Sequence, residues 1–350
     1  MAYMFDGCSS LKLIPLLDTS NVTSMAYMFD GCRSLPYAHI NAYNTSNVTD
    51  MSNMFSNCSK LKQLSFAGCD LRKVTDWDNI VNYSNNLEVV DLTNTKISNG
   101  FKFSNFGKNI TFTYEGLDTS NMTKTNYLFT VPNNNNVDIS NFNLSNVTDM
   151  SRTFSENTSN SIIVGNIDTS KVTNMSYMFY ICSNITNLDL TGLDVSKVTN
   201  MNDMFYNCSK LTNLNITGWN TSSLTSMADM FSYCKKIDTL DLSSINISKV
   251  TNVLRLFQYC TTNSLILDGW NFSNVTSFDN WVSSQSSKNV SLKNVVANGN
   301  FLCPLATESI DLTGINTTKC TSFKLNGCKS PIIDVSSFNT SNFTSMSGMF

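Results

Sequence analysis

The sequence is poor in the residues on which most catalytic and metal sites depend. It has one histidine, His39, and none of its cysteines form a CxxC pair. Zinc sites use closely spaced cysteines and histidines, and nucleophilic triads use a histidine base, so neither kind of site is favoured. The motifs GxxxxGKS/T and GxGxxG are also absent, which excludes the common phosphate-binding loops.

Charge and long apolar runs are scarce as well. Asp, Glu, Lys and Arg make up 14% of the residues, and the formal net charge is −3. The basic residues are scattered, so neither a nucleic acid nor an anionic membrane surface is an expected partner. No apolar run approaches the roughly 20 residues that a membrane-spanning helix needs. The N-terminus lacks a basic segment followed by an apolar one, so it does not resemble a signal peptide.

What the chain has instead is an internal repeat of about 25 residues. Two long intervals, 75–123 and 276–321, each span nearly two repeats, and we interpret each as hiding one degenerate repeat. Residues 1–350 are therefore expected to form a single array of about fourteen coils, truncated at both ends and degenerate at 66–120 and 283–335. The equivalent threonines of the repeat are Thr23, Thr49, Thr75, Thr123, Thr148, Thr173, Thr199, Thr225, Thr251, Thr276, Thr321 and Thr344.

Each repeat contains a pattern typical of a short helix and a pattern typical of a strand. Met25, Met28, Phe29 and Cys32 fall at i, i+3, i+4 and i+7, which favours one face of a helix, and Thr23 is placed to cap it. After the cysteine, segments such as 211–216 alternate apolar and polar residues, which predicts a strand with one buried face. The sequence thus predicts an α/β repeat fold, a leucine-rich-repeat-like solenoid with one strand and one short helix per coil and a parallel sheet.

Two of these segments also resemble a known family. Residues 168–179, Asp-Thr-Ser-Lys-Val-Thr-Asn-Met-Ser-Tyr-Met-Phe, and the strand segment 185–190 resemble the BspA-like leucine-rich-repeat surface proteins. Within that family they are most similar to the subgroup first met in mycoplasma surface lipoproteins. The resemblance covers the whole chain and is strongest in residues 1–65 and 140–262. It implies a solenoid that is displayed on the cell surface or secreted, and it brings no catalytic residue and no cofactor with it.

Aspartates recur at two positions of the repeat and raise the question of calcium binding. Stacked carboxylates could bind calcium, but asparagine replaces aspartate at Asn44 and Asn220. A hydrogen-bonding role in a turn or on the strand face explains both residue types, so no metal is predicted. The residues expected on the strand face, and therefore the possible ligand-facing residues, are Asp91, Asp189, Asn215, Asp241 and Asp311.

Seven of the eleven cysteines occupy one position of the repeat. A disulfide needs Cα atoms about 4.4–6.8 Å apart, and each cysteine can pair only once. We therefore interpret the seven as small buried apolar residues, and regard the four outside this position, Cys69, Cys303, Cys320 and Cys328, as the better candidates for a bridge. The seven residues of this cysteine ladder are Cys8, Cys32, Cys58, Cys182, Cys208, Cys234 and Cys260.

The expected function is non-catalytic adhesion or protein and glycan binding at the cell surface. Surface or matrix proteins or glycans of a host or a neighbouring cell are the expected partners, because a repeated surface gains avidity on a repetitive partner. A unique epitope is expected in the irregular stretches 66–120 and 283–335. The alternative is a structural spacer or scaffold stalk that presents another domain. An enzyme on a parallel β-helix and an ice-binding threonine array are less favoured, since repetition copies one surface whereas an active site needs one unequal constellation.

Overall fold

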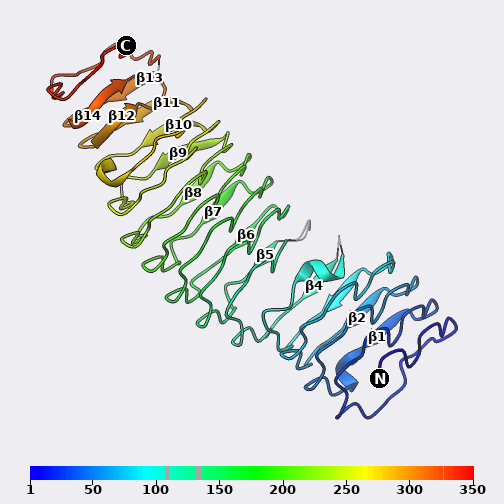
Figure 1. Cartoon of the computed structure of the whole chain (residues 1–350). Helices are drawn as coiled ribbons and strands as arrows, with labels where there is room; N and C mark the ends of the chain where they lie inside the picture. The colour runs from blue at the N-terminus through cyan, green and yellow to red at the C-terminus, as the bar shows by residue number, and fades with distance from the viewer. Residues whose placement is uncertain (108–109, 131–135, 326) are drawn as a thin grey trace.

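The structure, a computed structural model, describes residues 1–107, 110–130, 136–325 and 327–350. In this part of the chain, short strands and tight turns wind into an elongated coil, with the two termini at opposite ends (Figure 1). The strands are β1 (Tyr37–His39), β2 (Gln63–Ser65), β3 (Val89–Asp91), β4 (Thr111–Thr113), β5 (Val137–Asp138), β6 (Ile162–Ile163), β7 (Asn187–Asp189), β8 (Asn213–Asn215), β9 (Ile237–Asp241), β10 (Thr261–Ile266), β11 (Ser286–Ser291), β12 (Val296–Leu302), β13 (Ala306–Asp311) and β14 (Asn316–Lys324).

The strands pair in parallel with the equivalent strand of the next turn. The pairing orders are β1-β2-β3-β4, β5-β6, β7-β8, β13-β11-β10-β9 and β12-β14. Many hydrogen bonds between neighbouring turns join residues 25 or 26 apart, such as Thr45 to Asp70 and Thr49 to Thr23. The predicted parallel-sheet solenoid of about 25 residues per turn is therefore confirmed.

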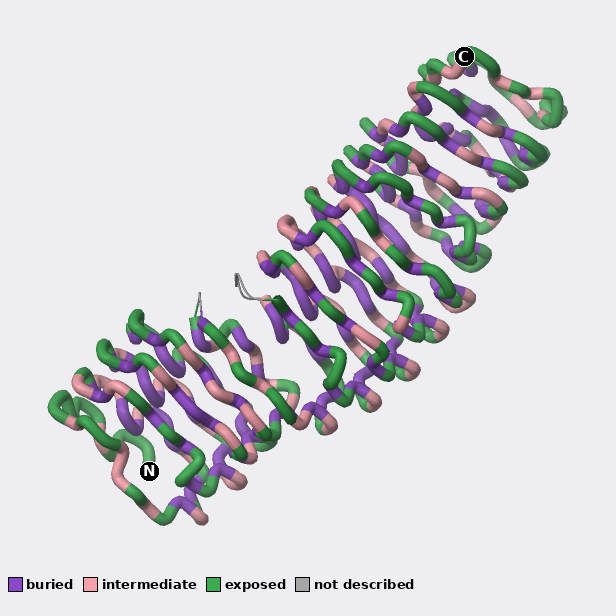
Figure 2. Tube along the Cα trace, turned by 180° about the vertical axis from the view of Figure 1, so that it is seen from behind, coloured by how far each residue is buried: buried purple, intermediate pink, exposed green. Residues whose placement is uncertain are grey.

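One continuous apolar core runs along the inside of the coil, and buried residues follow it from end to end in Figure 2. Phe179, Phe205 and Phe231 are buried and stack on one another, with ring centroids 5.7 and 5.5 Å apart. The buried indoles of Trp219 and Trp270 donate hydrogen bonds to backbone carbonyls of the preceding turn, at 2.9 and 2.8 Å. Both tryptophans therefore belong to the core and offer no exposed ring face to a sugar.

The predicted helix in each coil is wrong. In the described residues the helical elements are three 3-10 turns, η1 (Ile40–Ala42), η2 (Phe103–Phe106) and η3 (Phe272–Asn274), and there is no α-helix. The segment expected as a helix folds into consecutive tight turns: the N–H of Met28 bonds to the carbonyl of Met25 at 3.1 Å. Other N–H groups of this segment bond to the neighbouring turn instead. The N–H of Met25, for example, donates to the backbone carbonyl of Asp50 in the next turn at 2.9 Å.

Left-handed residues explain why a helix cannot form there. Tyr27 and Gly31, four residues apart, have φ values of 55° and 68°, and a right-handed helix does not accommodate either. Two successive turns of four residues place apolar side chains at i, i+3, i+4 and i+7 as well, so the spacing does not distinguish them from a helix. Residues equivalent to Tyr27 with positive φ are Asn53, Asn79, Tyr127, Arg152, Tyr177, Asp203, Asp229, Arg255 and Asn280.

The recurrent threonine therefore does not cap a helix. The hydroxyl of Thr49 donates to the carbonyl of Thr23 at 3.1 Å, and the hydroxyl of Thr225 donates to that of Thr199 at 2.9 Å. The backbone N–H of Thr49 bonds to the same carbonyl of Thr23 at 2.8 Å. The threonine is thus a link between turns, which gives the residue a role where it recurs in successive repeats.

The cysteine ladder is buried and unbridged from Cys32 onward. The thiol of Cys58 lies 3.1 Å from the carbonyl oxygen of Phe29 in the preceding turn. The thiol of Cys208 lies 3.1 Å from the carbonyl oxygen of Phe179 in the same way. All eleven cysteines fall within the described residues and all are free. No bridge forms among the four cysteines outside the ladder, so the interpretation of those four as bridge candidates finds no support.

Burial should protect the ladder from alkylation. Burial raises the pKa of the Cys58 and Cys234 thiols to about 12, and only the thiolate reacts readily. We expect iodoacetamide to label the exposed Cys8 and the half-buried Cys328 in the folded protein and to spare the ladder from Cys32 onward until denaturant is added. Peptide mass spectrometry measures this, and labelling of native Cys208 at the rate of Cys8 would contradict the packing described above.

Candidate functional site: the cleft between β4 and β5

The five residues predicted to face a ligand share one place in the structure. Each is the last residue of its strand: Asp91 of β3, Asp189 of β7, Asn215 of β8, Asp241 of β9 and Asp311 of β13. In each, a side-chain oxygen accepts a hydrogen bond from the backbone N–H two residues later, from 2.9 Å at Asp241 to 3.3 Å at Asn215. These side chains therefore shape the turn that follows the strand.

Two of the five come together on the sheet surface. Asp189 and Asn215 are paired in register and line a shallow groove of about 250 Å³ over β7, β8 and β9. Asp91, Asp241 and Asp311 lie outside it, and Asp311 forms an ion pair of 3.2 Å with Lys293. Contact of these residues with a ligand stays a prediction. Within the described residues no cluster of three His, Cys, Asp or Glu side chains is arranged to hold a metal ion.

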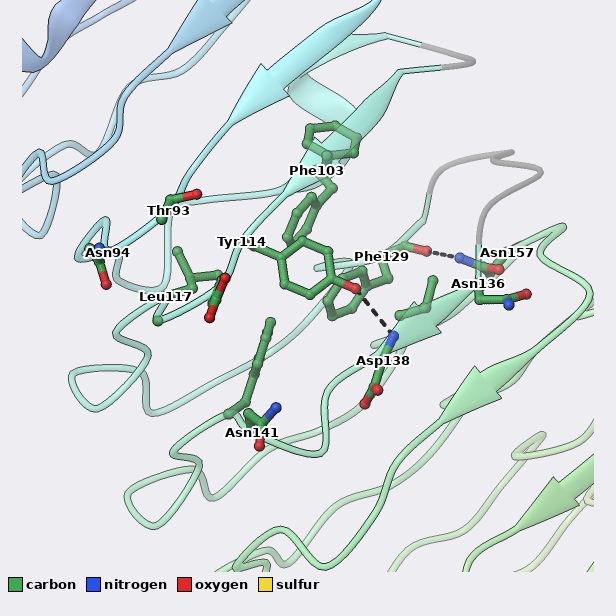
Figure 3. Close-up of a pocket in the computed structure, with 15 residues that line it drawn as sticks. Thr93, Asn94, Phe103, Tyr114, Leu117, Phe129, Asn136, Asp138, Asn141 and Asn157 are labelled. Atoms are coloured by element: carbon green, nitrogen blue, oxygen red, sulfur yellow. Dashed lines mark hydrogen bonds between the residues drawn. The ribbon is translucent and has the colours of Figure 1, made fainter.

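A larger opening, of about 870 Å³, lies between β4 and β5 (Figure 3). The sheet is interrupted there, because β4 pairs only with β3 and β5 only with β6. In place of a backbone pair, the N–H of Asp138 donates to the hydroxyl of Tyr114 at 3.2 Å. Paired strands lie about 4.8 Å apart, so a whole tyrosine side chain between β4 and β5 means that the two turns have spread on the sheet side.

The same two turns stay joined away from the sheet. The side-chain oxygen of Asn99 accepts hydrogen bonds from the N–H groups of Thr123 and Lys124 at 2.8 and 3.1 Å. The N–H of Phe103 bonds to the carbonyl of Leu128 at 3.0 Å, and the rings of Phe103 and Phe129 stack at 4.5 Å. The opening is therefore a wedge, closed on this side and open at the sheet. We call it the β4–β5 cleft.

Aromatic rings form the interior of the β4–β5 cleft. Phe103 contacts Phe112 and Tyr114 edge to face at 4.8 and 5.7 Å, and Tyr114 contacts Phe142 at 5.8 Å. Figure 3 shows the Tyr114 ring crossing the opening from β4 toward Asp138. Burial raises the pKa of the Tyr114 hydroxyl, so it remains a neutral hydrogen-bonding group near pH 7.

The rim of the cleft is polar and acidic. Exposed Asn94, Asn136 and Asn141 stand beside the carboxylates of Glu115 and Asp138. No lysine, arginine or histidine occurs among the described residues that line the cleft. Apolar walls with a few convergent polar groups are typical of a binding site. The described residues of the lining include no histidine, cysteine or lysine that could serve as base or nucleophile.

Sequence reasoning located half of this site and missed the rest. The wall from Thr93 to Leu117 lies in the stretch 66–120, where a unique epitope was expected. The opposite wall, which includes Phe129, Asp138 and Asn157, was not singled out. Asp138 ends β5 as Asp189 ends β7, and its Oδ1 accepts a hydrogen bond from Ser140 N–H at 2.9 Å. The Asp-x-Ser/Thr spacing it shares with the other strand ends could have revealed it.

A second departure from repetition is a row of charged side chains at positions equivalent to Tyr27, where the backbone is left-handed. Its members are Arg152, Asp203, Asp229 and Arg255. Arg255 donates two hydrogen bonds of 2.9 Å to Asp229, which is 5% exposed. Asp203, in the turn before Asp229, is half-buried, and the guanidinium of Arg152 lies 4.0 Å from the centre of the Tyr177 ring. Burial, with a smaller contribution from the Asp229 carboxylate, raises the pKa of Asp203 to about 6. Tyr177, Arg255 and Arg152 act on this carboxyl in the opposite direction.

The contribution of Asp203 to the stability of the folded protein should fall as the pH rises. A carboxyl whose pKa is about 6 in the folded protein and 3.8 ordinarily binds its proton more tightly when folded, so the contribution of Asp203 to stability is largest below pH 4 and is lost as the pH rises through 6. Asp203→Asn should therefore remove about 2 kcal/mol of this loss between pH 4 and pH 7. Urea unfolding at the two pH values measures it, with the exposed Asp279→Asn as control. An unaltered pH dependence in Asp203→Asn would refute this assignment.

The fold and the cleft define this protein as a parallel β-solenoid repeat protein with one non-repetitive cleft. Its sequence matches the family described as Mycoplasma protein of unknown function, DUF285, in three successive segments, residues 1–106, 95–190 and 181–295. The chain therefore belongs to that family. No curated protein matches the sequence. The described residues include no helix with the length and apolar character needed to cross a bilayer.

Proposed function

We propose that this chain is a non-catalytic binding protein of the cell surface, or a secreted one, that attaches to surface or matrix proteins or glycans of a host or neighbouring cell. The observation that carries the proposal is the β4–β5 cleft. It is a roomy aromatic opening in a repeat array, and its lining is suited to binding. The resemblance of residues 168–179 to BspA-like surface proteins supports the same function.

The rest of the array would contribute by repetition. The groove over β7, β8 and β9 presents rows of exposed amides and carboxylates, including Asn187, Asn213 and Asp238. Such a surface offers many similar weak contacts, which add up when the partner is itself repetitive. In this proposal the cleft supplies specificity and the repeated sheet surface supplies avidity.

The alternative, a structural spacer, is favoured by one specific observation. The recurrent threonine and strand-end aspartate side chains form hydrogen bonds with nearby backbone groups, as Thr225 and Asp241 do, and so have a structural role. A spacer would tolerate any exposed residue on the sheet surface. Replacing Asn187, Asn213 and Asp238 together by serine should therefore weaken binding to cells or matrix in the adhesin and change nothing in a spacer.

Protease shaving of intact source cells tests the location. Repeat peptides released from unbroken cells and identified by mass spectrometry would support surface display, and lysed cells provide the control for protease access. Peptides recovered only after lysis would contradict surface display and favour an intracellular scaffold. The binding itself is tested with the purified chain on immobilised matrix proteins and glycans, and failure to bind any intact cell or matrix component would overturn the proposal.

A further inference from the structure

The two strands that border the β4–β5 cleft each present an unpaired backbone edge to the other. In β4, the N–H of Thr111 and the carbonyl of Thr113 bond to residues of the β3 turn, at 2.9 and 2.7 Å. Backbone groups of alternate strand residues point to opposite edges, so those of Phe112 point toward β5. No strand of the described chain pairs with β4 on that side.

The opposite wall has the matching arrangement. In β5 and just after it, the N–H groups of Val137 and Ile139 bond to the β6 turn at 3.0 and 2.9 Å. The backbone of Asp138, between them, therefore points toward β4, and its N–H donates the hydrogen bond to the Tyr114 hydroxyl. Tyr114 thus stands where a further strand would bond to both edges.

We propose that the β4–β5 cleft takes an extended peptide segment of a partner protein, which adds as a strand between the edges of Phe112 and Asp138. An aromatic or aliphatic side chain of the segment would pack among the rings of the cleft, and a lysine or arginine beside it would face Asp138 and Glu115. Addition of a strand to a free sheet edge is an established mode of peptide recognition. The inference rests on the proposed function and specifies the partner's chemistry.

The unpaired edges favour a peptide over a glycan. A strand supplies alternating N–H and C=O groups to both sides, which a sugar chain cannot do in register. Phe112 on β4 and Tyr114 directly after it, together with Phe103 and Phe142, give the 870 Å³ opening an apolar lining. The rim carries two carboxylates and no basic residue among its described members, so the charge it complements is positive.

The first experiment selects peptides and then changes the rim charge. A phage-displayed library of random linear heptapeptides is panned on the whole chain, and the selected peptides are measured by fluorescence anisotropy. We expect an apolar residue flanked by lysine or arginine, and a loss of affinity of at least tenfold in Asp138→Lys. Asp241→Lys is the matched control, because both aspartates are exposed strand ends whose Oδ1 accepts a hydrogen bond of 2.9 Å from a serine N–H two residues later.

The second experiment tests whether the peptide backbone is the recognised feature. Methylation of single backbone nitrogens in the centre of a selected peptide should lower affinity at least tenfold, and methylation at its ends should not. Tyr114→Phe should bind somewhat more tightly than wild type, because the incoming strand no longer has to replace the hydrogen bond from Asp138 N–H.

Three results would overturn the strand-insertion proposal. They are a library that yields no binder, peptides that bind Asp138→Lys as well as wild type, and insensitivity to backbone methylation. These results differ from failure of the proposed function. If the whole chain binds cells and Asp138→Lys binds them equally, adhesion stands and strand insertion is wrong. If peptides insert but the chain binds no cell or matrix component, the reverse holds.

Discussion

Truncation of Phe205 to alanine should divide the unfolding of this protein into segments. Phe205 is fully buried and stacks between Phe179 and Phe231 at 5.7 and 5.5 Å. Loss of a buried phenylalanine ring costs about 3–5 kcal/mol. In a solenoid each turn contacts only its neighbours, so this loss falls on the two interfaces that the ring fills rather than on the whole molecule.

Urea unfolding followed by far-ultraviolet circular dichroism and by proteolysis measures this effect. We expect Phe205→Ala to show an early transition for the turns around residue 205 and a later one for the remainder. Ile332→Ala, which truncates a side chain that is 79% exposed, should change stability by less than about 0.5 kcal/mol. One transition at the wild-type midpoint in Phe205→Ala would show that the ring is not part of a continuous core.

Replacement of Arg255 by methionine should have the second-largest effect. The Asp229 side chain is only 7% exposed, and Arg255 satisfies both of its carboxylate oxygens. After the change, its remaining side-chain partner is the hydroxyl of Ser232 at 3.1 Å. Removing one member of a buried ion pair costs about 3–5 kcal/mol. Because 44% of the arginine side chain is exposed, we expect a loss near 3 kcal/mol, at the low end of that range.

A double-mutant cycle separates the cost of leaving the Asp229 carboxylate without its partner from the other effects of replacing Arg255. Asp229→Asn combined with Arg255→Met should recover most of the stability lost in Arg255→Met alone, because a neutral amide is cheaper to leave without its charged partner. Equilibrium denaturation of the four proteins gives the coupling between the two sites. Additive losses would show that the ion pair contributes little beyond the packing of the arginine stem.

Much of the architecture could be predicted from the sequence because it depends on repetition. The spacing of Thr173, Thr199 and Thr225 gives the length of a turn, and alternation in segments such as 211–216 gives the strand. Identical turns can bury their apolar stripes only by stacking, so the parallel sheet follows from these two observations.

The helix could not be rejected on spacing alone. Met25, Met28, Phe29 and Cys32 face the core in tight turns as they would in a helix. The deciding quantity is the left-handed backbone of Tyr27. Asparagine and aspartate, which favour the left-handed region, occupy that position in some turns, but tyrosine and arginine, which do not, occupy it in others. The position therefore carries no uniform left-handed signal as glycine would give.

The β4–β5 cleft could not be predicted, because it depends on how two particular turns fit together. Phe129 continues the column of Phe179, Phe205 and Phe231 by stacking on Phe154, and Phe103 stacks on Phe129 in turn. The ring of Tyr114 lies outside this column and meets Phe103 edge to face. The Tyr114 side chain stands between β4 and β5 in place of a backbone pair. Sequence irregularity in 66–120 locates one wall of the cleft, but the separation of the strands results from packing in three dimensions.

The hydrogen bonds between turns also determine how the molecule responds to tension. Links such as that from Thr49 to Thr23 connect one turn to the next along the length of the solenoid. A force that draws the two chain ends apart therefore loads these links in series, and the turns yield one after another. Each released turn of about 25 residues adds about 80–90 Å of extended chain. The strands share no ladder pair at the β4–β5 cleft, nor between β6 and β7 or between β8 and β9. We expect extension to begin at these junctions, so that under load the protein lengthens in steps before it breaks.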